Sequence, residues 1–113
     1  MAAVRPESNV FACLRDSGLA ALHILARGQE EMARRFFAPT RVEDKDINGE
    51  PFQDGPFDAP ILSNAPAYLE CRVRRIFDGL GDHALVVLEV VGAECREQSE
   101  PLTIADTPWE YSG

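Results

Sequence analysis

The chain has 113 residues, of which 45% are hydrophobic and 27% charged, and this composition predicts one small globular domain over residues 1–113 with a single core. The formal net charge of −8 disfavours nucleic acid and anionic membrane surfaces as partners. No apolar run approaches the roughly 20 residues that span a bilayer, and the N-terminus has no secretory signal. The three cysteines make neither a disulfide framework nor a zinc site. A reduced, cytoplasmic protein is therefore expected.

A short helix and a strand are predicted first. Ser8 can cap a helix over residues 9–16, and Gly18 can end that helix in the left-handed conformation. The apolar side chains of this helix are expected to be buried: Val10, Phe11 and Leu14. Residues 19–25 are nearly all apolar and are interrupted by His23, which indicates a buried strand.

A second helix and a long irregular segment follow. The helix over residues 29–37 has acidic residues in its first turn and basic residues in its last turn, as suits the helix dipole, and Pro39 stops it. Residues 38–66 hold five prolines and show no sustained period, so they are interpreted as a long loop. This loop is either a cover packed against the side of the fold, which its apolar residues favour, or a flap beside a binding site.

Residues 67–95 predict an antiparallel hairpin. The first run alternates like a half-buried strand, with one face made of Leu69, Cys71 and Val73 and a second, polar face made of Tyr68, Glu70, Arg72 and Arg74. The turn over residues 78–82 holds two glycines and two aspartates, and residues 84–91 are apolar apart from Glu89, as suits a strand buried between layers. His83 lies just past the turn, at the mouth of the space that the hairpin helps to enclose.

The hairpin resembles the flavin reductase-like, FMN-binding split-barrel family, whose members carry Leu-Glu-Cys, Gly-Asp-His and Glu-Val-Val in this order. Here the three motifs occupy residues 69–71, 81–83 and 89–91. The resemblance covers nearly the whole chain, because it extends to residues 17–25, to residues 29–37 and, as the family's last strand, to residues 101–111. Family members usually begin with several strands that this chain does not have.

The resemblance implies a mainly β fold with short flanking helices: a split antiparallel β-barrel, shortened at its N-terminus. It also implies a flavin reductase that binds FMN or FAD and transfers hydride from NADH or NADPH to the flavin. The expected partners are a second copy of the chain, in a homodimer that would cover the open barrel edge, and a flavin-dependent oxygenase. The alternative is a non-catalytic remnant that acts as a flavin-binding or oligomerisation module.

The Gly-Asp-His motif supplies the candidate catalytic residue. The resemblance implies that His83 orients the hydride donor and acceptor, with Gly81 and Asp82 beside the cofactor. An imidazole at this position can donate a hydrogen bond or carry charge near neutral pH. The residues alone favour a plain turn, in which Asp82 forms the turn, Gly81 supplies backbone freedom and His83 faces water.

Three further residues are implied as cofactor contacts. Arg5 and Ser8 stand where family members place a basic residue and a hydroxyl near the flavin phosphate, and a helix N-terminus flanked by such groups suits a phosphate. Without flavin, Ser8 is simply a helix cap and Arg5 a solvated side chain. His23 stands where the family often has asparagine near the flavin, and a lone histidine in an apolar strand is more often a hydrogen-bonded core residue.

Overall fold

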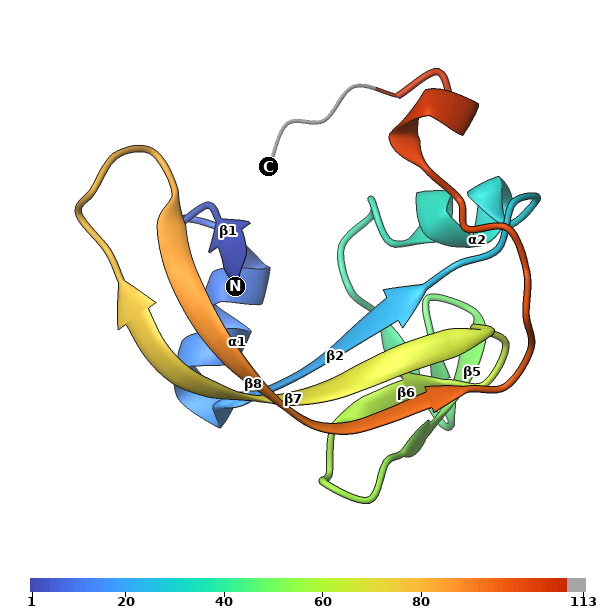
Figure 1. The fold of residues 1–113 in the computed structure, drawn as a ribbon, viewed down its shortest axis with the longest axis horizontal. Coiled ribbons are helices and arrows are strands. Elements are labelled where there is room, and N and C mark those ends of the chain that lie inside the picture. The colour runs from blue at the N-terminus through green and yellow to red at the C-terminus, as the bar shows by residue number, and fades with distance from the viewer. Residues whose placement is uncertain (110–113) are drawn as a thin grey trace.

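The computed structural model describes residues 1–109, which form two four-stranded antiparallel sheets, two α-helices and a short 3₁₀ helix (Figure 1). The first sheet has the order β1-β8-β7-β2 and the second the order β3-β4-β5-β6. The elements are β1 (Ala2–Val4), α1 (Asn9–Ser17), β2 (Leu19–Ile24), α2 (Glu30–Arg35), β3 (Val42–Glu43), β4 (Asp46–Ile47), β5 (Glu50–Asp54), β6 (Pro60–Leu62), β7 (Ala67–Phe77), β8 (Ala84–Cys95) and η1 (Ile104–Asp106). The predicted mainly β architecture with short flanking helices is confirmed.

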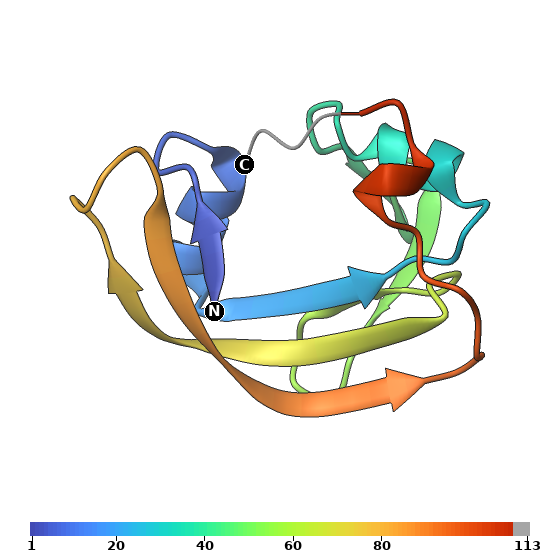
Figure 2. The ribbon, with the colours of Figure 1, turned by 45° about the horizontal axis from the view of Figure 1, so that its top comes forward.

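The long strands β7 and β8 curve, so the first sheet forms an open half-barrel instead of a flat layer (Figure 2). Two irregularities in their pairing, between Glu70 and Cys71 and between Val73 and Arg75, accompany this curvature. In both views β1 and α1 lie on one arm of the curve, and α2 and η1 lie on the other. The hairpin predicted over residues 67–95 is therefore the spine of the fold. Within the described residues, no helix is long and apolar enough to cross a membrane.

Cross-strand partners share a face of the sheet, so the register divides the first sheet into an apolar and a mixed face. Two rows of cross-strand partners lie at the centre of the apolar face. One row is Ala20, Cys71 and Val90, and the other is Leu22, Leu69 and Ala93. One end of this face packs against α1, in a core cluster of Phe11, Leu14, Ala84 and Val86. At the other end Leu22, Ile24 and Val90 are 44%, 48% and 53% exposed, and we call these three side chains the open apolar face. A substantial apolar surface of the sheet is thus left uncovered.

The loop between β5 and β6 covers part of the mixed face of the sheet, and Glu70 anchors that loop. Glu70 is 1% exposed, and its Oε2 accepts hydrogen bonds from the backbone N–H of Phe57 at 2.9 Å and of Ala59 at 3.0 Å. Its Oε1 has no hydrogen-bond partner among the described residues. A Cβ added at Gly55 would lie 2.5 Å from that Oε1, so backbone and carboxylate are tightly apposed. The alternation of β7 predicted a polar face that includes Glu70, and Glu70 is nevertheless buried because a second layer covers it.

Several local predictions need correction. The segment 38–66, interpreted as a long loop, contains β3 to β6, whose two to five residues are too short to show a period in sequence. The predicted last strand is only an isolated bridge from Pro101 to Ala26 followed by η1, and Tyr111, within that predicted strand, lies outside the described residues. Val10 is 61% exposed instead of buried, because α1 turns Phe11 and Leu14 toward the sheet.

Candidate functional site

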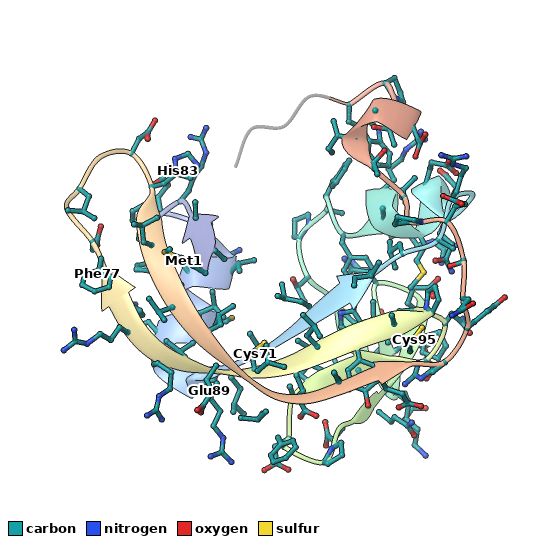
Figure 3. The ribbon with its side chains drawn as sticks, in the orientation of Figure 1. Met1, Cys71, Phe77, His83, Glu89 and Cys95 are labelled. Carbon is teal, nitrogen blue, oxygen red and sulfur yellow. The ribbon has the colours of Figure 1, made fainter. Side chains whose placement is uncertain are left out.

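The pairing of β1 with β8 brings the N-terminal segment to the Gly-Asp-His motif. Val4 pairs with Ala84, so the next positions outward, Arg5 and His83, lie side by side at the same end of the two strands. Figure 3 shows His83 at this end of β8, beside the N-terminal strand. Two of the predicted site residues, 78 positions apart in sequence, therefore meet through a strand of only three residues.

Ser8 acts as the N-cap of α1. Its Oγ accepts a hydrogen bond from the backbone N–H of Phe11 at 3.1 Å and donates one to the carbonyl of Arg5 at 2.8 Å. These bonds fold residues 5–8 back on themselves and hold Arg5 close to the first turn of the helix. The capping role predicted for Ser8 is confirmed, and the Arg5 side chain also forms an ion pair with Glu7 at 3.7 Å.

His83 has one ring nitrogen engaged and one without a partner. Its Nδ1 lies 3.0 Å from Oδ1 of Asp82, while its Nε2 is buried with no hydrogen-bond partner among residues 1–109. The hydrogen bond from His83 lowers the pKa of the Asp82 carboxyl below its usual value, and the charges of His83 and Arg5 act in the same direction. Arg5, Asp82 and His83, which we call the Arg5–His83 cluster, thus combine a cation, an anion and an unsatisfied imidazole nitrogen.

Gly81 does not supply the backbone freedom expected of it. The turn residue in the left-handed region is Gly79, with φ of 81°, and its N–H bonds to Oδ1 of Asp78 at 2.7 Å. A Cβ at Gly81 would meet nothing within 4 Å. Sequence alone could not decide which of the two glycines the turn requires.

His23 lies apart from the Arg5–His83 cluster, on the strand at the opposite edge of the first sheet. Its Nε2 accepts a hydrogen bond from the backbone N–H of Leu62 at 3.0 Å, as expected of a hydrogen-bonded packing residue, although the side chain is only half-buried. Gln29 donates to the carbonyl of Asn64 at 3.0 Å, and Arg96 donates to the carbonyls of residues 62, 63 and 65 at 3.0 to 3.3 Å. Three side chains from separate segments thereby fix the turn after β6.

The hydrogen bond of His23 makes the stability of the fold depend on pH. Burial, and secondly the charge of Arg96, lower the pKa of His23 below its usual 6.5. As the pH falls below about 6.5, the unfolded chain takes up a proton that the folded chain resists, so the free energy of unfolding should fall; above about 6.5 this contribution is fully present. Urea unfolding between pH 7.5 and 5.5 measures the effect.

The matched control for this pH dependence is His23→Gln, whose side-chain oxygen can accept the same N–H without titrating. Both proteins keep His83, so any contribution of that residue cancels in the difference. The loss of stability toward pH 5.5 should be smaller in His23→Gln. Parallel pH profiles of the two proteins would show that His23 does not carry the effect.

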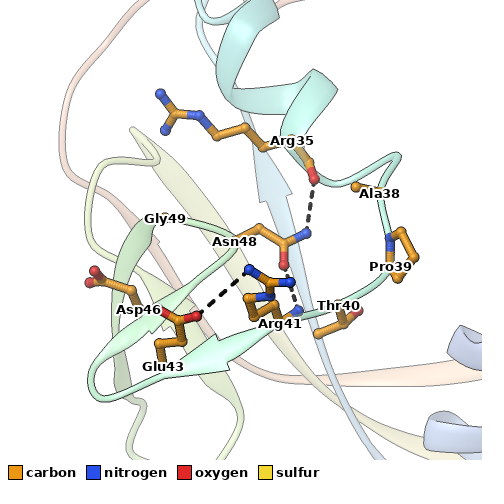
Figure 4. A pocket seen from close by; sticks show the side chains of 9 residues that line it. All are labelled: Arg35, Ala38, Pro39, Thr40, Arg41, Glu43, Asp46, Asn48 and Gly49. Atoms are coloured by element: carbon orange, nitrogen blue, oxygen red, sulfur yellow. Dashed lines mark hydrogen bonds and ion pairs between the residues drawn. The ribbon is translucent and has the colours of Figure 1, made fainter.

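Sequence reasoning did not find the cavity between the end of α2 and the β3–β4 hairpin (Figure 4). Asn48 organises it: its side-chain amide donates to the carbonyl of Arg35 at 2.8 Å and accepts from the backbone N–H of Arg41 at 2.7 Å. Arg35 also pairs with the buried carboxylate of Glu50, and Arg41 pairs with Glu43 at 3.8 Å. Both arginines that line the cavity therefore have a carboxylate partner, unlike the Nε2 of His83. The only signal of this cavity in the sequence was the Asn48-Gly49 turn.

Comparison with known proteins identifies the family to which this fold and its Gly-Asp-His motif belong. The family model described as "Flavin reductase like domain" matches residues 1–109. A flavin reductase (NADH) of Kitasatospora aureofaciens is 32% identical over 96 residues, which cover 84% of this chain and 49% of that protein. The reductase subunit HsaB of a flavin-dependent monooxygenase from Rhodococcus jostii is 32% identical over 92 residues, covering 80% and 45%. The chain thus spans about half the length of these relatives.

The fold comparison gives the same result. The structure of the Streptomyces globisporus C-1027 NADH:FAD oxidoreductase SgcE6 matches with a TM-score of 0.70 and 30% sequence identity, covering 82% of this chain and 55% of that one. The resemblance predicted from the three hairpin motifs is confirmed, and so is the split-barrel type of the fold. The chain belongs to the flavin reductase like domain family.

Proposed function

We propose that the chain acts in flavin reduction, transferring hydride from NADH or NADPH to FMN or FAD. Its family and the names of its relatives support this activity. The observation that carries it is the buried Nε2 of His83, a polar atom without a partner among the described residues, at the motif where the family places flavin and nicotinamide. Such an atom is unfavourable unless a ligand or an ordered water satisfies it.

The residues of the Arg5–His83 cluster fit the two ligands in different ways. Flavin and nicotinamide supply the redox chemistry themselves when bound. His83 would orient the rings, because its free nitrogen can make one directional hydrogen bond. Arg5, held near the first turn of α1 by the Ser8 cap, offers a charged donor for the flavin phosphate. Gly81, with open space beside it, allows a ring to approach the turn.

Titration with FMN tests this proposal. The chain is expected to bind FMN with micromolar affinity, about −8 kcal/mol, and to quench its fluorescence. Arg5→Gln should weaken the binding of FMN by about 1.5 to 3 kcal/mol, because it removes a charged hydrogen bond to the phosphate. Riboflavin, which has no phosphate, should bind Arg5→Gln and the parent equally. Absence of FMN quenching at high protein concentration would contradict the proposed activity.

The second candidate function is a non-catalytic module that binds flavin or mediates oligomerisation. The open apolar face favours it, since Leu22, Ile24 and Val90 are about half exposed on an open sheet. Consumption of NADH separates the two candidates. A chain that binds FMN but does not oxidise NADH in its presence is a binding module, whereas turnover identifies a reductase.

We also propose that the chain forms a homodimer. Among residues 1–109, one strand edge of β1 has no partner, and Leu22, Ile24 and Val90 are exposed. Proteins commonly cover such surfaces by association. Light scattering at working concentration should give twice the monomer mass of 12.5 kDa. A monomer across the concentration range would count against the dimer.

The proposed acceptor of the reduced flavin is a flavin-dependent oxygenase. The support is the relative that is named as the reductase subunit of a flavin-dependent monooxygenase. Product formation by an added oxygenase of this class, supplied with NADH and flavin, should depend on the presence of this chain.

A further inference from the structure

We propose that Asp82 is a positioning residue that fixes the tautomer of His83, so that Nε2 is a hydrogen-bond acceptor reserved for an amide N–H of the bound ligand. The ligand part of this proposal rests on the proposed function, and the amide it assigns is the carboxamide of the nicotinamide. The tautomer part concerns the protein alone.

The contact between Asp82 and His83 determines where the imidazole proton lies. Oδ1 of Asp82 is 3.0 Å from Nδ1 of His83. An ionised carboxylate only accepts hydrogen bonds, so Nδ1 must carry the proton. The hydrogen bond from His83 lowers the pKa of Asp82, with a smaller contribution from the charge of Arg5, so the carboxylate stays ionised and remains an acceptor. The opposite tautomer would set two lone pairs against each other.

The surroundings of Nε2 determine what it can bind. In the neutral imidazole with a protonated Nδ1, Nε2 has a lone pair and no hydrogen. That atom is buried and no residue among 1–109 donates to it, although the His83 side chain as a whole is 25% exposed. A buried acceptor without a donor discriminates strongly in favour of ligands that bring an N–H. A primary carboxamide next to the reacting ring carbon meets this requirement.

In this proposal Asp82 acts through the ring of His83 and not through a contact of its own with the ligand. Its side chain is 90% exposed and turns back onto the ring of the neighbouring residue. Pairing of β1 with β8 places Arg5 beside the same ring, where its charge favours the ionised form of Asp82. The carboxylate therefore acts through His83, by fixing its protonation pattern and ring orientation.

The tautomer can be measured directly by ¹⁵N–¹H NMR of the imidazoles, without flavin. The chain has only two histidines, and His23 is an internal reference, because its Nε2 accepts from Leu62 and its proton must also lie on Nδ1. The parent should show a protonated Nδ1 and a bare Nε2 for His83. In Asp82→Ala the His83 proton should move to Nε2 while the His23 signals stay unchanged, and Asp82→Asn, which keeps an acceptor oxygen, should restore the parent pattern.

A proton on Nε2 of His83 in the parent, or an unchanged pattern in Asp82→Ala, would overturn the tautomer assignment. The ligand assignment is tested with NADH and its 3-acetylpyridine analogue, which lacks the carboxamide N–H. The preference for NADH in kcat/KM should fall about 10-fold in Asp82→Ala relative to the parent. An unchanged preference would overturn the ligand assignment. A parent inactive with both nucleotides would contradict the proposed function and leave the NMR result standing.

Discussion

His83→Ala should reduce flavin by NADH about 10- to 100-fold more slowly than the parent, with FMN affinity nearly unchanged. Under the proposed function the Nε2 of His83, which has no partner among the described residues, holds a ring in position. Loss of such a positioning contact raises the barrier to hydride transfer by roughly 1.4 to 2.8 kcal/mol. Stopped-flow measurement of flavin reduction, with enzyme saturated in FMN, isolates the hydride-transfer step from binding.

Leu80→Ala is the matched control for His83→Ala. Leu80 lies in the same turn and is 68% exposed, so its truncation tests whether a change anywhere in the turn slows the reaction. Such a surface substitution should shift stability by no more than about 0.5 kcal/mol. Equal rates for His83→Ala and the parent would reduce the Gly-Asp-His motif to a hairpin turn.

Glu70→Ala should destabilise the fold by about 2 to 5 kcal/mol, because it leaves the part-buried N–H of Phe57 and the buried N–H of Ala59 without an acceptor. A loss of this size is a large part of the 5 to 15 kcal/mol that typically stabilises a small domain. Urea unfolding monitored by circular dichroism gives the difference in the free energy of unfolding.

Glu70→Gln separates the role of the oxygen from that of the charge. Its amide oxygen can occupy the position of Oε2, and its amide nitrogen the position of Oε1, which has no partner among the described residues. The loss of stability should then stay below about 2 kcal/mol. If alanine and glutamine cost the same, the two N–H bonds are not what Glu70 contributes.

The sequence predicted the elements whose signals are local. The hairpin over residues 67–95 was visible because its strands are long and its turn is rich in glycine and aspartate. The cap at Ser8 and the left-handed Gly18 were visible because each depends on a few neighbouring residues. The strands β1 and β3 to β6 were missed, since two to five residues cannot establish a period and their pairing partners supply most of their stability.

The candidate site was predicted only through the family resemblance. Nothing local in the sequence says that Arg5 lies beside His83, because that contact depends on the pairing of β1 with β8. The packing role of His23 followed from its apolar neighbours, yet its partner Leu62 is 39 residues away. The burial of Glu70 could not be inferred from the alternation of its strand, because it depends on the loop that packs over that face of the sheet.

The apposition of Gly55 and Glu70 has a consequence for how this fold can evolve. A methyl group at position 55 would stand 2.5 Å from a glutamate oxygen on the strand below, so the two positions cannot drift independently. Any side chain at 55 would push the Glu70 carboxylate away from the N–H groups of Phe57 and Ala59, so we expect glycine at 55 to accompany glutamate at 70. Alanine at 55 should therefore be tolerated more easily in a chain whose residue 70 is shorter than glutamate.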